Sequence, residues 1–556
     1  MAEERVQKLL DKLPKLESYI QDLDFEVEGI CHMPDGQNAK EVHSLSEARM
    51  LWESLDLNDV DVLCIYGFTP FLYDLSKEWL RASQSRKLVI IDDRPEAFFL
   101  ALHQGCENLL DDLQLELHFF ESLLEMEPLM KKIAWNHIFL HLHFAALSSL
   151  DSEKRSYVKQ QFDRISLGVH LVASDYSDRG RLVMENVYFN CSSVGSFRNA
   201  SALKGCFEKI PAIICGSGPS LDRHQGLLGE MEDRALVFVG GSALGKMKGS
   251  PPHFAAAIDK QAPYHLHKLH AVFEAPFFYQ NRMSKDNFSL IHTDKFLVGD
   301  NGGYPLEQWL CEQLGMDLFP FEGGWNVGTL LIQLAEYFGC DPIILVGMDL
   351  SVQEKTASLK VKDLFGRPVY TQRDWLMAAK WIEEFAKRCK ARLINATEGG
   401  IGFGGVDNVS FETVQKEILK RSYDLWGLCH AQLKQIETRQ VHHALMKENI
   451  AQIEQSLVSL VDICTDHLDE LQDCYSKREF NKSLSLEEKM EKEMAYHTLL
   501  DPLWNIWKYF FVRESKKNQK IPHQFQLVLH QTLFFQSTLD MHLSLIEKWK
   551  ERNLGV

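Results

Sequence analysis

The chain has 556 residues, 45% of them hydrophobic and 25% charged, which is the composition of an ordinary folded protein. A chain of this length exceeds one compact core, so it predicts two to four domains. The formal net charge of −18 opposes a broad contact with a phosphate backbone, so nucleic acid is excluded as an expected partner.

The twelve cysteines are scattered without a Cys-x-x-Cys pair, and several lie inside apolar runs, as Cys64, Cys215 and Cys340 do. This pattern is typical of reduced, buried thiols and not of a disulfide framework. The amino-terminal segment is charged and amphipathic without an apolar signal core, and no stretch is apolar for long enough to span a bilayer. We therefore expect a cytoplasmic protein without a membrane span.

The first part of the chain, residues 1–165, alternates strand and helix signals. An apolar strand predicted over 61–67 ends in Gly67, and a second one over 87–93 ends in two acids. This order occurs in nucleotide-binding α/β units, where the acid accepts hydrogen bonds from ribose hydroxyls. Because Gly67 alone marks the turn, the pattern favours a structural or degenerate version of such a domain, similar to a Rossmann fold.

The middle part, residues 166–410, predicts a parallel sheet covered by helices on both faces. Its helical patterns include one over 328–338, and strands are predicted over 212–215, 235–239, 254–258, 276–279, 343–346 and 392–394. The residues after several strands are small or polar, as a ligand-binding edge of a parallel sheet requires.

A glycine turn follows the strand at 212–215 and is the most informative motif. It reads Gly216-Ser217-Gly218-Pro219-Ser220-Leu221 and leads into a predicted helix. Such turns direct backbone N–H groups at one point and favour a phosphate there, and Pro219 suits the first helical position. The third glycine of a dinucleotide fingerprint is absent, so the motif leaves open a nucleotide site or an ordinary tight turn.

A second turn, over 323–329, precedes the helix predicted at 328–338. Asn326 and Thr329 can exchange hydrogen bonds with a ligand, Trp325 can stack on a base or sugar, and Gly328 permits close approach. The alternative is a capped helix with a packed tryptophan.

Two acids follow predicted strands and are candidates for acid–base chemistry. Asp259 follows the strand at 254–258, and Asp349 follows the strand at 343–346. At these positions a carboxylate can accept from sugar hydroxyls, act as a base or cap the next segment. Five histidines are candidates for a base as well, although most are expected at the surface: His253, His265, His267, His270 and His292.

The last part, residues 411–556, contains few glycines and prolines and predicts a helical domain. Apolar residues recur at three- and four-residue steps from Ile453 to Tyr475, as on one face of an amphipathic helix. We expect a helical bundle or an arm through which the protein forms a homo-oligomer. Cys464 and His467 are expected in its core and not at a metal site.

The order of these segments resembles the motility-associated factor (Maf) proteins, which are linked to flagellin glycosylation. Their central domain is shared with archaeal hydroxymethylpterin pyrophosphokinases and is similar to bacterial sialyltransferases. The resemblance spans about three quarters of the chain and rests on residues 43–51, 61–93, 210–222 (IPAIICGSGPSLD), 252–259, 328–350, 366–371 and 395–400 (NATEGG).

The resemblance implies an α/β fold with a Rossmann-like amino-terminal domain, a Rossmann-like or sialyltransferase-like central domain and a helical carboxyl-terminal domain. It also implies a glycosyltransferase that moves a nonulosonic sugar from a CMP-activated donor to a protein hydroxyl, on a flagellin-like or other acceptor. The turns at 216–221 and 325–329 would then hold the nucleotide, and Asp259, Gly241 and Ser242 would line the donor pocket.

No metal is expected for this transfer, whereas a pyrophosphokinase would need ATP and magnesium with paired carboxylates, which Asp259 and Asp349 can supply. One departure from the family pattern is that no histidine follows the Gly-x-Asp-Leu strand, since residues 351–361 read SVQEKTASLKV. The base is then Asp349 or a histidine before Asp300, or the chain is an inactive nucleotide-binding or scaffold relative.

Overall fold

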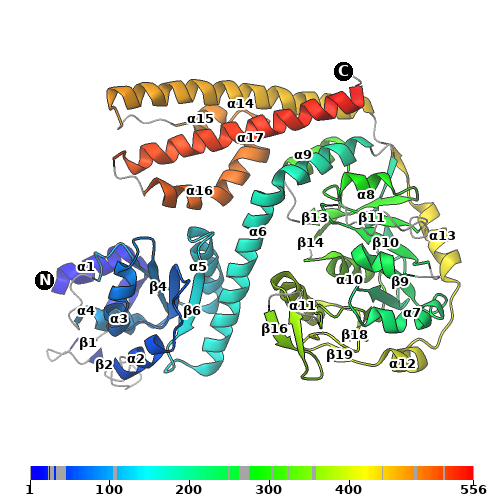
Figure 1. Cartoon of the computed structure of the whole chain (residues 1–556), viewed down its shortest axis with the longest axis horizontal. Helices are drawn as coiled ribbons and strands as arrows, with labels where there is room; N and C mark the ends of the chain where they lie inside the picture. The colour runs from blue at the N-terminus through cyan, green and yellow to red at the C-terminus, as the bar shows by residue number, and fades with distance from the viewer. Residues whose placement is uncertain are drawn as a thin grey trace. The chain divides into compact units, whose positions relative to one another are not determined.

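The computed structural model describes residues 2–22, 24–25, 31–32, 45–103, 109–193, 196–247, 251–261, 275–301, 305–316, 318–322, 325–353, 359–440, 443–480, 485–516 and 520–554. Its contacts group the chain into two compact units, one formed by Met1–Ser177 with Ile506–His523 and one by Asp178–Asn505 with Gln524–Val556. Each unit contains its own parallel sheet (Figure 1). The predicted domain boundaries near residues 165 and 410 stay a prediction.

The first unit is built on a parallel sheet with the strand order β5-β4-β3-β6. Its elements are α1 (Ala2–Lys12), η1 (Pro14–Asp22), β1 (Asp24–Phe25), β2 (Cys31–His32), α2 (Leu45–Glu53), β3 (Val62–Tyr66), α3 (Pro70–Arg81), β4 (Lys87–Asp92), α4 (Pro95–His103), β5 (Leu115–Phe119), α5 (Leu123–Asn136) and β6 (Leu142–Ala146). The central strands β3 and β4 are buried except for Lys87 at the start of β4, whereas the edge strand β5 alternates buried and half-buried residues.

The second unit holds a ten-stranded sheet with the order β19-β18-β15-β8-β9-β10-β11-β12-β7-β20, parallel except for β20. Its first elements are β7 (Ser196–Asn199), η3 (Ala200–Leu203), β8 (Ala212–Cys215), α7 (Leu221–Gly229), β9 (Leu236–Gly240), η4 (Gly241–Lys246), β10 (Phe254–Ala257), β11 (Phe277–Tyr279), α8 (Lys285–Ser289), β12 (Lys295–Leu297), β13 (Gly299–Asn301) and α9 (Pro305–Gln313).

The next elements of this unit are β14 (Pro320–Glu322), α10 (Val327–Tyr337), β15 (Ile343–Val346), β16 (Leu359–Lys362), β17 (Pro368–Thr371), α11 (Arg373–Arg388), β18 (Leu393–Asn395), β19 (Asp407–Asn408), α12 (Phe411–Thr413), η7 (Val414–Ile418), α13 (Leu425–Gln435) and β20 (Arg439–Gln440). Strands β13 and β14 form a separate two-stranded sheet, as do β16 and β17. Each predicted strand of the middle part is present to within one residue at either end. The chain runs outward from β8 to β12 and then returns to β15 beside β8, so the strand order reverses between β8 and β15.

The last elements are helices, α14 (His443–Lys477), α15 (Glu487–Met490), η8 (Tyr496–Leu500), α16 (Asp501–Ser515) and α17 (His523–Leu554). A 42-residue helix, α6 (Ser152–Ser193), contributes residues to both units, which divide after Ser177. The predicted apolar face of α14 is buried at Ile453, Leu457, Leu460, Cys464 and Leu471, but Tyr475 is 55% exposed, so its assignment to the core was wrong. The mixed α/β fold with parallel sheets and a carboxyl-terminal helical region is confirmed.

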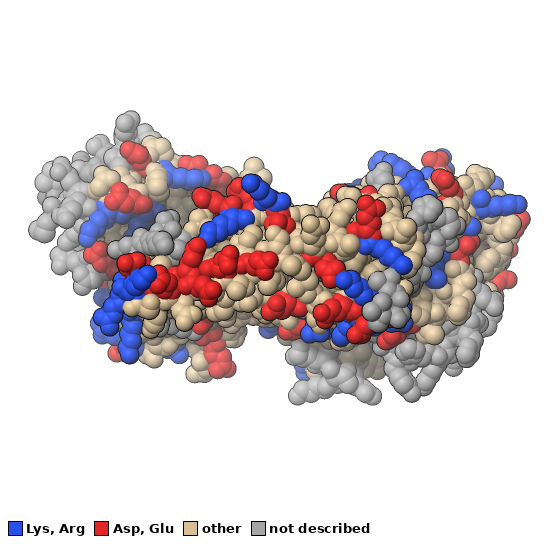
Figure 2. Space-filling model, turned by 90° about the horizontal axis from the view of Figure 1, so that it is seen from above, with Lys and Arg blue, Asp and Glu red and all other residues tan. Residues whose placement is uncertain are grey.

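Acidic side chains gather on the outer side of these helices, as the view in Figure 2 shows. Asp462, Asp466, Asp469 and Asp473 are all exposed on α14, where spacings of three and four residues place them on one face. The field of this face repels phosphate backbones, in keeping with the expectation that nucleic acid is not a partner.

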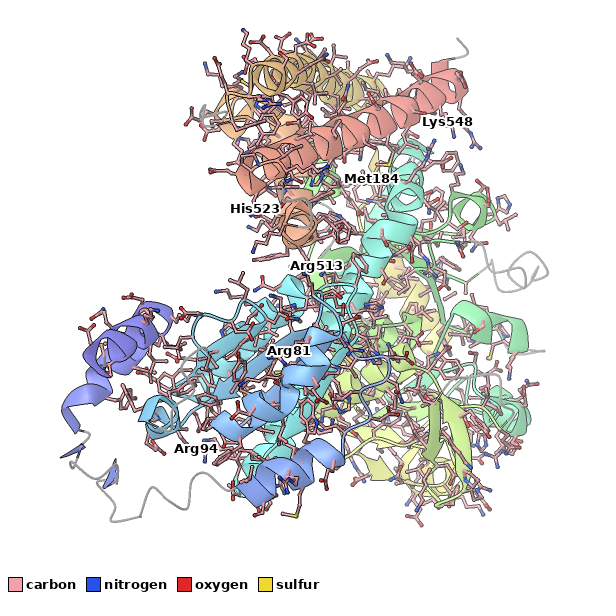
Figure 3. The ribbon with its side chains drawn as sticks, turned by 60° about the vertical axis from the view of Figure 1, so that its left-hand side comes forward. Arg81, Arg94, Met184, Arg513, His523 and Lys548 are labelled. Atoms are coloured by element: carbon pink, nitrogen blue, oxygen red, sulfur yellow. The ribbon has the colours of Figure 1, made fainter. Side chains whose placement is uncertain are left out.

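Part of α16 belongs to the first unit. Arg513, labelled in Figure 3, donates from its guanidinium to the carbonyl of Ile138 over 2.8 Å. The rings of Trp507 and Phe139 stack with their centres 5.5 Å apart, and Phe510 packs against the core of the same unit. The helical carboxyl-terminal region therefore contributes to both units, which the composition of residues 411–556 did not indicate.

Candidate functional site

The reversal of strand order between β8 and β15 brings the two most informative motifs together. In open parallel sheets a ligand binds beyond the carboxyl ends of the strands at such a reversal. The turn Gly216–Leu221 follows β8, and Gly347, Met348 and Asp349 follow β15. The backbones touch here, because a Cβ added to Gly216 would lie 2.4 Å from the carbonyl oxygen of Gly347. These glycines are therefore required by the packing of the two strand ends.

The amide groups of the turn are mostly occupied by bonds within the protein. Gly216 donates to the carbonyl of Val346, Gly218 to that of Gly347 and Leu221 to that of Gly218, over 2.8–3.1 Å. Ser220 donates to the side chain of Asp349. The interpretation of the turn as a cradle of free N–H groups is therefore wrong for these four amides. Helix α7 begins at Leu221, so Pro219 lies in the turn before it and not at the first helical position.

The Asp349 carboxylate occupies the inside of the turn where an anion was expected. Its Oδ2 accepts from Ser220 Oγ over 2.6 Å and from Ser220 N over 3.2 Å, and a Cβ on Gly218 would lie 1.9 Å from the same oxygen. Asp349 is 5% exposed. Burial raises its pKa above the ordinary value, although the Ser220 hydrogen bonds and the nearby Arg223 act in the opposite direction. A carboxylate placed here selects ligand groups that donate hydrogen bonds, such as hydroxyls and amines.

The end of β9 adds a second set of predicted residues beside the first. Ser242 Oγ lies 2.7 Å from Ser217 Oγ, and both side chains are exposed. Gly241 adopts a positive φ of 54°, and a Cβ there would lie 3.6 Å from Asp259 Oδ2. Asp259 is exposed at the end of β10. The two serines and Asp259 thus line one continuous stretch of the sheet edge, over β8, β9 and β10.

The amino terminus of α10 covers this edge from one side. Asn326 caps the helix, with its side chain accepting from Thr329 N over 3.0 Å while Thr329 Oγ1 accepts from Asn326 N. A Cβ on Gly328 would lie 2.6 Å from Cε of Met348. Asn326 and Trp325 are half-buried, whereas Gly328 and Thr329 are fully buried, as is Leu221 at the start of α7. Gly323 and Gly324 lie outside the described residues.

Two residues near Asp349 have strained backbone. Leu350 and Glu398, neither of them glycine, adopt positive φ angles of 48° and 55°. Gly400 lies against the backbone of Asp349, because a Cβ there would be 2.2 Å from the Asp349 carbonyl oxygen, and Ile401 donates to that same oxygen over 3.1 Å. Strained backbone of this kind is enriched at functional sites. The NATEGG segment of the sequence therefore holds Asp349 in place.

Three residues near this edge were missed by reasoning from the sequence. Lys246 Nζ lies 2.8 Å from Asp222 Oδ2 and 3.4 Å from the carbonyl oxygen of Gly218. Arg223 donates to the carbonyl of Glu398 over 2.7 Å. His224 Nε2 lies 3.1 Å from a carboxylate oxygen of Glu398, and burial lowers the pKa of this histidine while Glu398 acts in the opposite direction. One feature of the sequence could have indicated these residues: all three lie in the first turns after a strand that ends in glycine.

The histidine considered as a base at position 253 lies in the interior of the second unit. His253 is fully buried, its Nδ1 accepts from Val237 N over 3.1 Å, and its ring stacks on Trp426 with centres 4.5 Å apart. Burial lowers its pKa to about 4. His253 therefore packs the interior and does not reach a substrate. His265, His267 and His270 lie outside the described residues.

The first unit has a similar reversal of strand order, between β3 and β6, but side chains fill it. A Cβ on Gly67 would lie 2.8 Å from Leu147 Cδ1. Asp92, the acid at the end of β4, is fully buried and accepts from Phe68 N over 2.6 Å and from the guanidinium of Arg94, which Figure 3 labels. Because the Asp92 carboxylate oxygens already accept hydrogen bonds from the protein, the geometry favours a structural role for this unit over nucleotide binding.

Cys464 and His467 both lie in the buried face of α14, as expected, and the His467 Nδ1 lies 3.0 Å from Thr532 Oγ1. Within the described ranges no three His, Cys, Asp or Glu side chains are grouped so that they could hold a metal ion. Likewise, no helix among those residues combines the length and apolar character needed to cross a membrane.

Comparison with known proteins relates this architecture to two groups. Residues 183–355 match the family model described as 6-hydroxymethylpterin diphosphokinase MptE-like. No curated protein matches the chain. The solved structure of a Maf glycosyltransferase from Magnetospirillum magneticum AMB-1 superposes with a TM-score of 0.55 at 13% identity, covering 100% of this chain and 99% of the other. The chain therefore has the fold of a Maf glycosyltransferase, with an MptE-like region over residues 183–355 of its second unit.

Proposed function

We propose that the chain is a glycosyltransferase that transfers a nonulosonic sugar from a CMP-activated donor to a hydroxyl group of a protein. One observation carries the proposal: residues from three separate predicted motifs converge at the β8–β15 reversal, where parallel sheets bind ligands. The shared fold with a Maf glycosyltransferase supports it.

In this proposal Asp349 positions the donor. Its buried carboxylate accepts hydrogen bonds from hydroxyl or amino groups of the nucleotide, while Ser220 holds it in the correct orientation. Trp325, half-buried at the start of α10, offers a ring on which the base can stack. The nucleotide phosphate then faces the exposed hydroxyls of Ser217 and Ser242 and the ammonium of Lys246, in place of the amides already used within the turn.

Asp259 is the proposed general base. It is exposed at the sheet edge, where an acceptor hydroxyl can approach, whereas Asp349 is buried and already accepts two hydrogen bonds. Asp259 removes the proton from the acceptor hydroxyl, whose oxygen forms a bond to the anomeric carbon. The bond from that carbon to the phosphate oxygen breaks, and CMP leaves with its negative charge stabilised by Lys246 and the serine hydroxyls.

A hydroxymethylpterin diphosphokinase is the alternative, because residues 183–355 match that family model. This activity would use ATP with magnesium held by Asp259 and Asp349. An inactive relative that only binds a nucleotide is the third possibility. Localisation in the cytoplasm, a flagellin-like acceptor and a homo-oligomer formed through the helical region stay predictions.

Thermal shift with CMP, CDP, ATP and GTP, each with and without magnesium, distinguishes these functions. A ligand at a hundred times its dissociation constant stabilises a protein by about 2.7 kcal/mol. The proposal expects a shift with CMP that does not need magnesium and that is lost in Asp349→Asn. Exposed Asp407, on the edge strand β19, gives the matched control Asp407→Asn, which should keep the full shift.

The second step is an assay for release of CMP from a CMP-activated nonulosonic acid. Release that needs an acceptor protein and falls in Asp259→Asn supports the transferase. A shift only with ATP and magnesium assigns the chain to the diphosphokinase alternative. The absence of a shift with every nucleotide leaves the inactive relative.

A further inference from the structure

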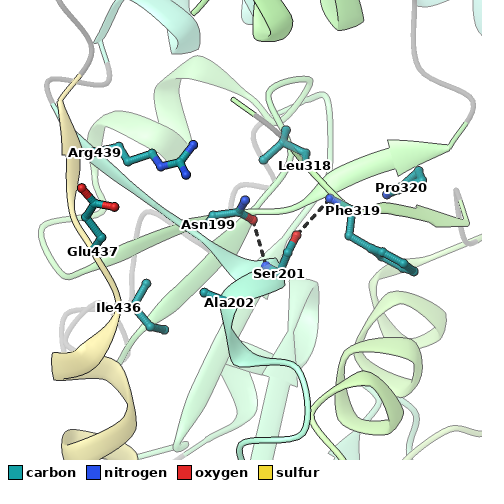
Figure 4. Close-up of a pocket in the computed structure, with 9 residues that line it drawn as sticks. All are labelled: Asn199, Ser201, Ala202, Leu318, Phe319, Pro320, Ile436, Glu437 and Arg439. Atoms are coloured by element: carbon teal, nitrogen blue, oxygen red, sulfur yellow. Dashed lines mark hydrogen bonds between the residues drawn. The ribbon is translucent and has the colours of Figure 1, made fainter. Parts of the chain in front are cut away.

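The second unit contains a cavity of about 530 Å³ at the other end of the sheet from the β8–β15 reversal (Figure 4). Its lining comes from three segments: the end of β7 with η3, the start of β14, and the segment that joins α13 to β20. Five strand spacings separate β7 from β8, which corresponds to about 24 Å along the sheet. The volume lies within the range of small-molecule sites, and no part of the proposed donor site lines it.

Opposite charges stand next to each other on one side of the cavity. Glu437 and Arg439 are both exposed and lie two residues apart on the extended segment leading into β20. Arg439 donates one hydrogen bond, over 2.9 Å, to the carbonyl of Gly315, which leaves most of its five N–H groups for a ligand. Among the described residues neither side chain forms an ion pair. A guanidinium and a carboxylate are thus presented together.

The opposite side of the cavity is apolar. Leu318, Phe319 and Pro320 form it, with Asn199 and Ser201 between this side and the charged one (Figure 4). Phe319 is 42% exposed, and its ring is held by Phe321 and Tyr337, whose ring centres lie 5.0 and 4.7 Å away. Ser201 Oγ accepts from Phe319 N over 2.9 Å, which fixes the backbone of this side. The cavity therefore combines a supported aromatic ring with a donor and an acceptor of opposite charge.

Three classes of ligand fit this lining poorly. A phosphate or other anion is repelled by Glu437, a cation is repelled by Arg439, and a wholly apolar ligand leaves both charges without hydrogen bonds. A hydroxyl group both donates and accepts, so adjacent hydroxyls on one ring satisfy the carboxylate and the guanidinium together. The apolar face of the same ring can rest on Phe319.

We infer that this cavity binds a neutral saccharide, separately from the nucleotide-sugar site at the β8–β15 reversal. The saccharide lies with its hydroxyl edge toward Glu437 and Arg439 and with its C–H face on Phe319. Its binding does not depend on whether the other site transfers sugar.

Saturation-transfer NMR on the full chain tests this with glucose, galactose, N-acetylglucosamine, maltose and lactose, followed by titration of any that bind. Phe319→Ala should weaken binding about tenfold, because the apolar contact is lost. Glu437→Gln removes the charged acceptor and should weaken it about fivefold. The matched controls are Phe365→Ala, at a phenylalanine 62% exposed on the turn between β16 and β17, and Glu417→Gln, at an exposed glutamate, both outside the cavity.

Because Phe319→Ala also loses ring contacts, its fold is checked by circular dichroism, and Glu437→Gln keeps the test valid if that variant unfolds. Binding of no saccharide in the panel overturns the inference, as does binding that both cavity variants leave unchanged. Glycine or alanine binding with the same dependence on Glu437 would assign the cavity to amino acids and overturn it too. A loss of CMP binding in Glu437→Gln would show that the two sites are not separate.

Discussion

Ser220 and Asp349, 129 positions apart in the chain, form a buried pair in which the serine donates two hydrogen bonds to one carboxylate oxygen, from Oγ over 2.6 Å and from N over 3.2 Å. The pair joins the turn after β8 to the loop after β15, at the point where the strand order reverses. In a phosphate site, the amide and hydroxyl of Ser220 would bind the phosphate. Here they bind the Asp349 carboxylate, which is an anion of the protein itself. Under the proposed function, the ligand must therefore supply hydrogen-bond donors to Asp349.

Removing the hydroxyl of this pair should destabilise the protein. Ser220→Ala leaves a buried carboxylate with one hydrogen bond fewer, which should lower the free energy of unfolding by about 2 kcal/mol. Ser217→Ala is the control in the same turn, because Ser217 is exposed and bonds only to the exposed Ser242. Chemical denaturation of both variants measures the difference. Equal stability of the two would mean that the Ser220 hydroxyl contributes nothing to holding Asp349.

The turn has no room for a side chain at Gly218. A Cβ there would lie 1.9 Å from the Asp349 carboxylate oxygen, so Gly218→Ala should displace Asp349 and abolish stabilisation by CMP. Gly226, inside α7, has nothing within 4 Å of its added Cβ. Gly226→Ala should keep the CMP shift and raise the free energy of unfolding by about 0.5–1 kcal/mol, because alanine favours a helix. A full CMP shift in Gly218→Ala would place the nucleotide elsewhere.

Nucleotide binding should depend on pH through Asp349. Burial raises the pKa of this carboxyl, so the carboxylate takes up a proton at a higher pH than an ordinary aspartate does as the solution is acidified. The protonated group accepts poorly, and affinity for CMP should therefore fall with falling pH while the protein is still folded. Isothermal titration between about pH 8 and about pH 5 measures the profile, since an ordinary aspartate has a pKa of about 3.9. A wild-type affinity for CMP that stays constant across this pH range would contradict this role.

His253 should make the second unit sensitive to acid. Its pKa in the folded state is about 4, against about 6.5 when unfolded, so the unfolded chain binds the proton more readily. The resulting loss of stability begins as the pH falls below about 6.5 and is complete near pH 4, reaching about 3 kcal/mol. The melting temperature of His253→Gln should fall less steeply with acid than that of the wild type. His292→Gln, at an exposed histidine, should retain the wild-type slope.

Much of the fold could be predicted from short stretches of sequence. Runs such as 212–215 and 343–346 are wholly apolar, because strands buried on both faces of a parallel sheet have no solvent side. The glycines at 216 and 218 were recognised as marking a turn after a strand, although the group that packs against them was not. A phosphate was expected at this turn, whereas the structure places Asp349 there.

The candidate site also contains residues that no local pattern indicates. Lys246 and Arg223 gain their positions from contacts with Gly218 and Glu398, which lie 28 and 175 positions away. Tyr475 continued an apolar spacing but is 55% exposed, whereas its neighbour Cys474 is buried. The division of α16 between the two units could likewise not be predicted from its composition. The packing partners of a helix are set by the fold and not by its own apolar face.

The sequence by itself determined where strands and helices form, because burial periodicity and turn chemistry act over a few residues. It also determined that two acids follow strands of one sheet. Only the tertiary structure decided that Asp349 lies inside the turn at Gly218 while Asp259 stays exposed at the edge. That difference arises from the order of strands, which brings β15 and not β10 beside β8, and strand order is a long-range property that no local pattern encodes.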